Sequence, residues 1–418
     1  MNEVGSPPRD VSDEPAAATA PRRDAALSWN AFLSTYLPAL VLALGTGIAL
    51  PAVPTLAKSF GVSFGVASGV LTAFLLGNLA GTLPSGWLID RFGRRSVMIA
   101  GPLLTSALAF LVALAHSFPE LLLLRFFDGC AAQMWLMGRL AAISQGAAVG
   151  QRGRQVSWMF GMNNTGKLAG PMLGGFIASA WGPRAPFVAY AVIALLALVP
   201  ASLFDEESVR GVRAKAQAAS RALSIRQIVA PRLVYFGVAL FAGLTRGPVQ
   251  ADLLHLYAAF AYHLGPRQIG YLATGAAVIT WPIGFTAGWM LDRFGRKRTM
   301  VPGFVGVAIA MCALAISAFG HFALAWYVAL FLLGVALQAL TGGSIQTVGA
   351  DVAPPEARGK FLGLWRFTGQ AGVALSPIVF AVLADQVNYG SAFLFTAASA
   401  AVVAFLLIRF VPETRTAE

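Results

Sequence analysis

Long stretches without a single Asp, Glu, Lys or Arg constrain the fold of this chain more than any motif does. A helix needs about 20 predominantly apolar residues to cross a bilayer core. One charge-free stretch, 299–350, is long enough for two crossings and breaks at FGHFAL, 319–324. The stretches of at least the required length are residues 25–57, 59–89, 96–119, 185–204, 268–291, 299–350 and 386–408. They predict an all-α membrane protein.

Further stretches carry only a few charges and complete the set of predicted spans. They cover roughly residues 118–146, 155–180, 233–258 and 360–384. With them the sequence predicts twelve transmembrane helices, which we number as spans in chain order.

Composition supports a membrane location. Charged residues make up 11% of the chain and its mean hydropathy is +0.70, whereas a soluble domain carries about 25% charged residues. The net charge of +12 is typical of nucleic-acid binding in a soluble protein. In a chain that crosses the membrane many times, we assign basic loops to anionic lipid instead and expect no nucleic-acid partner.

The basic residues also predict the orientation, because cytoplasmic loops retain Lys and Arg. With the N-terminus inside, only Lys58, Arg184 and Arg267 fall in outer loops, so both termini are predicted to be cytoplasmic. The predicted organisation is a disordered tail (1–28), a six-helix bundle (29–204), a cytoplasmic linker (205–232), a second six-helix bundle (233–411) and a short tail (412–418).

One ten-residue segment occurs twice. GWLIDRFGRR, residues 86–95, follows span two and returns as GWMLDRFGRK, residues 288–297, after span eight. Two more pairs agree at a similar offset, with Arg152 matching Arg358 and Pro171 matching Pro377. The chain is therefore predicted to be a duplicated six-span unit in parallel orientation, which is a known transporter plan.

On these residues the chain resembles the major facilitator superfamily over about residues 30–411. RFFDG, residues 125–129, resembles the Arg-x-x-x-Gly element of span four, and GKLAGPMLGG, 166–175, is similar to the span-five motif of proton-coupled antiporters. The resemblance implies two pseudo-symmetric six-helix bundles and the 12-span drug:proton antiporter branch. It also implies a multi-pass protein of the inner membrane that is driven by the proton gradient, with no cofactor or metal. High Ala content and an excess of Arg over Lys are typical of a GC-rich bacterium.

The two copies of the repeat predict a cytoplasmic gate. Asp90 and Asp292 end their helices, where the macrodipole disfavours an anion, so each needs a compensating partner. The resemblance adds contacts with the start of spans eleven and five in the opposite half. We expect these contacts to close the cytoplasmic side in one state and release it in the other, with topology anchoring as the alternative. The predicted gating residues are Gly86, Asp90, Arg91, Gly93, Arg94 and Arg95, and Gly288, Asp292, Arg293, Gly295 and Arg296.

Small residues predict a packing seam in span five. Gly166, Gly170 and Gly174 recur every four residues on one helix face, beside Pro171 and Gly175. Such residues let a neighbouring helix approach closely, and neighbouring helices can compensate the bend at a proline.

Charges inside spans indicate function, because a charge at membrane depth is costly unless it is paired or hydrated. Asp128 follows Arg125 by three residues, so the two share a helix face, and Lys167 lies at a similar depth on the next span. We predict that Asp128 exchanges partners or a proton between these two cations, with a static ion pair as the alternative. Arg139 lies far enough along span four to snorkel to the cytoplasm, so we expect it to take no part.

LTRGPVQADLLHLY, residues 244–257, predicts a broken helix in span seven. We expect Gly247 and Pro248 to interrupt it, with Arg246, Asp252 and His255 clustered around the break, because broken helices at membrane depth line cavities. Asp252 is then a second proton-coupling candidate.

Polar and aromatic residues of several spans suit a cavity for an amphipathic substrate. Span one has no charge and carries Gly47 where several drug antiporters keep an acid, so the predicted proton site moves to Asp128 or Asp252. The predicted cavity residues are Gln133, Trp135, Asn163, Lys167, Arg246, Trp281, Gln338, Arg366 and Gln370.

These features predict a secondary active exporter that exchanges protons for an amphipathic, drug-like small molecule by alternating access. A proton-coupled or uncoupled carrier of an organic anion or metabolite is the alternative, and a non-transporting receptor is a lesser one. An enzyme is not expected, since Leu168 replaces the Ser or Thr of a true P-loop after GMNNTGK. We expect a monomer whose partners are its substrate, protons and membrane lipids.

Overall fold

A computed structural model describes residues 32–146, 152–204, 227, 229–341, 344–354 and 358–411. All regular structure in these ranges is helical. The predicted tails 1–28 and 412–418, and most of the predicted linker, lie outside the described residues.

The first half of the chain supplies spans one to six. Span one opens with a π-helical turn, Phe32–Tyr36, and then consists of two helices that meet at Pro51. The helices of this half are α2 (Leu37–Ala49), α3 (Ala52–Ser59), α4 (Phe64–Phe92), α5 (Arg94–Leu114), α6 (Phe118–Gly146), α7 (Arg152–Trp181) and α8 (Ala185–Phe204).

The second half repeats this plan in spans seven to twelve. Its helices are α10 (Leu233–Gln250), α11 (Leu253–Ala261), α12 (Pro266–Phe294), α13 (Arg296–Phe319), α14 (Leu324–Leu340), α15 (Ser344–Val352), α16 (Arg358–Gln386) and α17 (Tyr389–Phe410), after a short 3-10 turn at Ala230–Arg232. Counting α2 with α3, α10 with α11, and α14 with α15, the described residues form twelve spans in two six-helix bundles, as predicted.

The break in span seven does not lie where the sequence suggested. Gly247 and Pro248 belong to α10, and the helix stops at Ala251 and Asp252, where Asp252 adopts a left-handed φ of 55°. Pro248 is tolerated inside the helix because neighbouring helices satisfy the backbone group that it frees. The matching break in span one shows that both halves share this feature.

The duplicated segment forms the same sharp turn twice. Gly93 separates α4 from α5 at φ 83°, and Gly295 separates α12 from α13 at φ 94°. Residues with a Cβ rarely adopt such angles, so glycine is needed at both positions. Directly after each turn an arginine reaches the end of another helix in its own half. Arg94 donates to the carbonyl of Ala142 at 3.4 Å, and Arg296 lies 3.3 Å from a carboxylate oxygen of Asp351.

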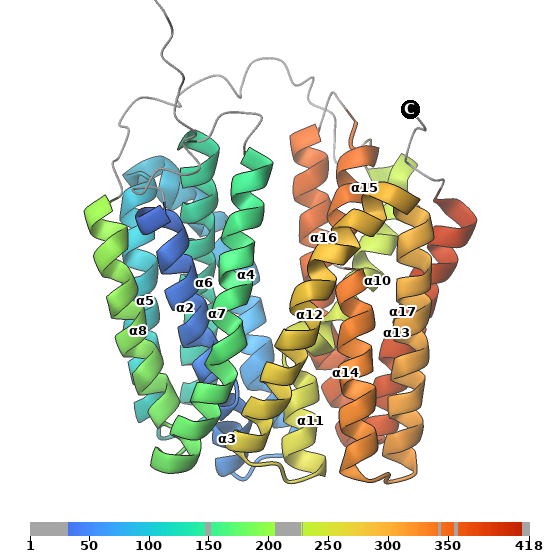
Figure 1. Cartoon of the computed structure of the whole chain (residues 1–418), viewed down its shortest axis with the longest axis horizontal. Helices are drawn as coiled ribbons and strands as arrows, with labels where there is room; N and C mark the ends of the chain where they lie inside the picture. Colours follow the sequence, from blue (N-terminus) through green and yellow to red (C-terminus); the bar gives the residue numbers. More distant parts are fainter. Residues whose placement is uncertain are drawn as a thin grey trace, which may run out of the picture.

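The two halves are inclined towards each other (Figure 1). We call the side where α8 ends and α10 begins the linker side, and the other the Asp385 side. In Figure 1 the blue-to-green half and the yellow-to-red half stand apart on the linker side and meet on the Asp385 side, around α3 and α11.

The surroundings of glycines on the four helices at the interface of the halves agree with this inclination. On the Asp385 side, Gly175 of α7 packs against Gly270 of α12. On the linker side of α4, α7, α12 and α16, a Cβ added at the glycine would meet nothing within 4 Å, as seen at Gly86, Gly161, Gly284 and Gly363. The interface is therefore closed on one side and open on the other.

The outer surface matches a lipid environment. Large apolar side chains such as Leu83, Trp181 and Ile309 are 65 to 84% exposed, which a soluble monomer would avoid over so many positions. Five described helical segments are by themselves long and apolar enough to cross a membrane, and one of them covers both α4 and α5. The chain is a multi-pass membrane protein.

Candidate functional site

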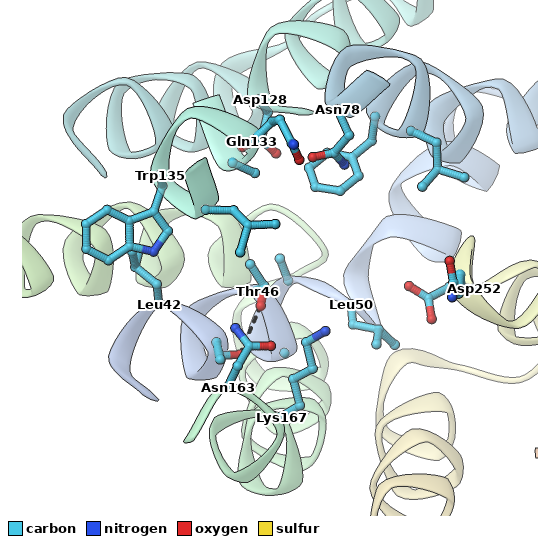
Figure 2. Close-up of a pocket in the computed structure, with 18 of the residues that line it drawn as sticks. Leu42, Thr46, Leu50, Asn78, Asp128, Gln133, Trp135, Asn163, Lys167 and Asp252 are labelled. Carbon is cyan, nitrogen blue, oxygen red and sulfur yellow. Dashed lines mark hydrogen bonds between the residues drawn. The ribbon is translucent and has the colours of Figure 1, made fainter. Parts of the chain in front are cut away.

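A cavity of about 620 Å³ lies between the two halves (Figure 2). Most of its wall comes from α2, α4, α6 and α7 of the first half, and the break in span seven and α16 close it from the second half. The described wall contains three basic residues, Arg125, Arg139 and Lys167, and two acidic ones, Asp128 and Asp252. A charged side chain at membrane depth costs free energy unless it is paired or hydrated. The surroundings of each of these five groups therefore matter.

Arg125 and Asp128 form a buried ion pair on one face of α6. The guanidinium donates to one carboxylate oxygen at 2.5 Å, and Asp128 is only 1% exposed. The guanidinium also stacks over the ring of Phe74, 4.5 Å from its centroid. The second oxygen of Asp128 has no hydrogen-bond partner among the described atoms. A carboxylate held by one cation through one oxygen retains a site that can accept a proton.

Lys167 is directed towards Asp252 rather than Asp128. Figure 2 shows the lysine on α7 and the aspartate at the break of span seven on the same side of the cavity, and Asp252 is the carboxylate whose charge acts on Lys167. Asp252 also lies 3.4 Å from the ring of the buried His255. The expected exchange of Asp128 between Arg125 and Lys167 is therefore not seen in this state; instead each acid faces its own cation.

Arg139 is not at the surface, and the expectation that it snorkels to the cytoplasm is wrong. It is 4% exposed and lines the cavity, with its guanidinium 4.8 Å from the centroid of the Trp135 ring. Burying an ion costs on the order of several kcal/mol, whereas a desolvated cation–π contact returns about 2 kcal/mol. Trp135 therefore offsets only part of the cost. The length of α6 suggested an exit to water, but the side chain of Arg139 is instead buried beside Trp135 in the cavity wall.

The other predicted cavity residues divide into three groups. Gln133 and Asn163 line the main cavity with Trp135. Arg246 and Arg366 line a separate small pocket, and Gln370 borders both. Trp281 and Gln338 are absent from both described walls: Trp281 is 41% exposed, and Gln338 is buried and donates to the carbonyl of Thr245 at 3.1 Å.

The expected cluster around the break of span seven is split. Arg246 donates to the carbonyl of Thr341, whereas Asp252 and His255 lie together beyond the break. The helix turns the arginine away from the aspartate because α10 continues through Pro248.

The predicted gating residues lie on the linker side, where the halves are apart. Asp90 and Arg91 are exposed, and a Cβ at Gly86 would meet open space. Arg293 stacks on Trp289 of its own helix, 5.3 Å from the ring centroid. Asp292 and Gly288 lie in α12, but their side-chain surroundings are outside what the structure describes.

The glycines of span five lie against two different helices. Added Cβ atoms at Gly166, Gly170 and Gly174 would run into the backbone of α2, at Leu40, Gly47 and Ile48 respectively. Gly175 instead faces Pro266 and Gly270 of α12. The motif thus joins spans one and five within a half and also closes the contact with span eight.

Polar contacts that the sequence did not indicate close the Asp385 side. Asp385 accepts a hydrogen bond from the hydroxyl of Ser63 at 2.5 Å and another from the backbone N–H of Gly65 at 2.9 Å. Its carboxylate therefore lies at the N-terminus of α4, where the helix dipole favours an anion. Lys58 of the first half donates to the carbonyl of Ala259 at 2.9 Å and contacts the ring of His263.

An aromatic cluster also joins the two halves on the Asp385 side. The ring of Phe64 in the first half meets those of Phe260, Phe380 and Tyr389 in the second, with centroids 5.1 to 6.1 Å apart. Ser63 was recognisable only as a helix N-cap, and Asp385 as a loop charge. Their hydrogen bond joins positions that are 322 residues apart, and no local pattern in the sequence predicts it.

Known proteins resemble this chain in sequence and in fold. The sequence model of the Major Facilitator Superfamily matches residues 36–251 and 238–418. The chain is 26% identical over 360 residues to the class B tetracycline resistance protein of Escherichia coli, covering 82% of this chain and 86% of that protein. It is 27% identical over 271 residues to multidrug resistance protein 1 of Bacillus subtilis, covering 64% of this chain and 68% of the other. Among solved structures, a D-xylose-proton symporter superposes with a TM-score of 0.75 at 20% identity, covering 92% of this chain and 98% of that one.

Proposed function

The chain belongs to the Major Facilitator Superfamily and is a transporter rather than an enzyme, and we propose that it exports an amphipathic small molecule in exchange for protons. Two observations support the proposal. The cavity lies between two inclined halves, which suits alternating access, and two relatives of the chain have names that denote drug resistance. The proton gradient would be its energy source.

The buried Arg125 and Asp128 pair carries the proton part of the proposal. Asp128 has one oxygen that accepts from Arg125 and one without a hydrogen-bond partner in the described part of the chain, so protonation would weaken the ion pair without exposing the carboxyl to bulk water. Breaking or forming this pair changes the charge of the wall that the substrate meets. Asp252, which lies on the same side of this cavity as Lys167, is a second group that can be coupled in this way.

The proposed location is the inner membrane of a bacterium, with both termini in the cytoplasm. Basic loops on the linker side support this orientation through the positive-inside rule. In that orientation the cavity opens to the cytoplasm, and the state described is the one that would load a substrate for export.

Proteoliposomes test the exchange. Purified protein is reconstituted with a pH dye inside and an imposed pH gradient, and lipophilic cations and organic anions are added in turn. We expect one class to evoke proton movement, and Asp128→Asn to abolish it while the protein still inserts and folds. Glu120→Gln is the matched control, because Glu120 lies outside the cavity wall and accepts a hydrogen bond from the backbone of His116. Substrate flux without proton movement, or unchanged coupling in Asp128→Asn, would contradict the proposal.

An organic anion or metabolite carrier is the second candidate. Arg246 and Arg366 line the small pocket on the second half of the molecule, and the main cavity has more cations than acids. In the same experiment this candidate predicts flux of the anions, either with proton movement or without it.

A further inference from the structure

Arg139 has no acidic partner in the cavity wall. Of the three cations in the described wall, Arg125 is paired with Asp128 and Lys167 faces Asp252. Arg139 makes no ion pair with any described residue, and its Nε and one Nη nitrogen have no hydrogen-bond partner there. The indole N–H of the buried Trp135, one helical turn earlier, also has no hydrogen-bond partner among the described residues.

The helix geometry places these donors in the same cavity as the proton-coupling candidate. Asp128, Trp135 and Arg139 are separated by seven and four residues, so at about 100° per residue they form one stripe along α6. All three line the cavity. At about 1.5 Å rise per residue, Arg139 lies roughly 16 Å from Asp128 along the helix, on the linker-side part of the wall.

We infer that Arg139 and Trp135 form an anion subsite, and that the transported compound is an amphipathic organic anion whose charged group binds there. A guanidinium presents donors in a planar fork that fits a carboxylate or sulfonate, and the indole N–H supplies a further donor. The apolar body of the compound then lies along Leu136, Met159 and Phe160, which share this part of the wall. This inference rests on the proposed transport function and names the class of substrate for it.

The separation of the two sites gives them different roles. A substrate anion at Arg139 is too far from Asp128 to share its proton, and Arg125 stays available to the aspartate. The substrate anion and the proton are therefore bound at separate sites, which are coupled only through the charge of the wall that they share.

Binding measurements with three probes of equal shape test the subsite. Naphthoate, naphthylmethanol and naphthylmethylammonium are titrated by calorimetry into the full chain in phosphatidylcholine nanodiscs. We expect naphthoate to bind most tightly and Arg139→Gln to weaken it by about ten- to a hundredfold, the range of one charge-assisted hydrogen-bonded contact. The same variant should leave the affinity for naphthylmethanol unchanged, and Arg139→Lys should recover part of the naphthoate affinity.

Arg232→Gln is the matched control. Arg232 also stacks over an aromatic ring, that of Phe361 at 6.0 Å, but lies outside the cavity wall, so naphthoate should bind this variant as it binds the native protein. A native protein that does not bind naphthoate at millimolar concentration, that binds the ammonium as tightly, or that is unaffected by Arg139→Gln would overturn the inference.

Nanodiscs that contain phosphatidylglycerol distinguish a soluble anion from a lipid head group. Unchanged naphthoate affinity supports the soluble compound, whereas a large loss assigns the subsite to lipid and overturns the substrate assignment. The binding assay needs no pH gradient. Failure of the subsite therefore leaves proton exchange untouched, and failure of proton exchange leaves the subsite standing.

Discussion

At the scale of single residues, the site depends on how each buried charge is balanced. Asp128 and Arg125 balance each other within one turn of α6, and Phe74 covers the guanidinium. Such a pair contributes little net stability while both partners are present, because desolvation cancels most of the attraction. Removing one partner alone is costly.

We expect Arg125→Met to destabilise the protein by about 3 to 5 kcal/mol, because it leaves the carboxylate of Asp128 buried without its cation. Combining it with Asp128→Leu should recover most of that loss, since both desolvated charges are then gone. Thermal unfolding of the purified single and double variants in one detergent measures the difference. A double variant as unstable as Arg125→Met would show that the arginine stabilises the fold through packing alone.

At the scale of helices, glycines decide which pairs can approach each other. On α7, Gly174 faces the backbone of Ile48 in α2, whereas Gly161 on the same helix faces open space. A backbone neighbour cannot rotate away as a side chain can, so even one added methyl group must push the helices apart.

Two alanine substitutions on α7 therefore should behave oppositely. Gly174→Ala is expected to lower stability by about 1 to 3 kcal/mol through overpacking. Gly161→Ala is expected to be neutral or to stabilise by up to about 1 kcal/mol, because alanine favours the helix over glycine. The unfolding temperatures of the two variants in the same detergent test this difference. Equal destabilisation of both variants would refute a specific contact at Gly174.

The duplicated segment also acts at this scale. Each copy ends one span, turns at a glycine of positive φ and begins the next span with an arginine that holds a neighbouring helix. Each copy also packs a tryptophan against a phenylalanine, Trp87 on Phe92 and Trp289 on Phe294. Aromatic side chains of this kind favour the membrane interface, so both copies suit the same membrane surface.

At the scale of the whole molecule, the described state is closed by Asp385, Ser63 and the aromatic cluster around Phe64, and open on the linker side. Alternating access requires these contacts to separate when the linker side closes. The Asp385 side is held by these hydrogen bonds and ring contacts and by apolar packing that continues from one half into the other, so all of these contacts must separate before that side can open.

A reversible cross-link tests this motion. In a background with Cys130→Ser and Cys312→Ser, Ser63→Cys with Asp385→Cys should form a disulfide, because the native hydroxyl of Ser63 hydrogen-bonds a carboxylate oxygen of Asp385 at 2.5 Å and the two side chains therefore meet. We expect oxidation to stop transport in proteoliposomes and a reductant to restore it. Transport that continues with the disulfide formed would show that these contacts do not separate during the cycle.

The pair Gly161→Cys and Gly284→Cys, on the linker side of α7 and α12, is the comparison. A Cβ at either position meets nothing within 4 Å, so this pair should not cross-link in the state described. Ready cross-linking of both pairs at once would argue against a single opening on the linker side.

Features that depend on short distances along the chain follow from the amino-acid sequence. Charge-free stretches require membrane spans because lipid cannot hydrate a charge, and the repeat at residues 86–95 and 288–297 implies two similar halves. The three-residue spacing of Arg125 and Asp128 places them on one helix face, so their proximity follows from the spacing alone. The four-residue period of the glycines in span five likewise predicts a close approach of another helix.

Helix packing in the folded chain sets which groups meet across helices and which side of the molecule is closed. It placed Lys167 on the same side of the cavity as Asp252 rather than beside Asp128, and it joined Ser63 to Asp385 across 322 residues. It enclosed Arg139, whose place on α6 suggested an exit to water, beside Trp135 in the cavity. The physical reason is the same in each case: local spacing fixes the face of a helix on which a side chain lies, whereas its partner depends on the tilt and packing of helices that are distant in sequence.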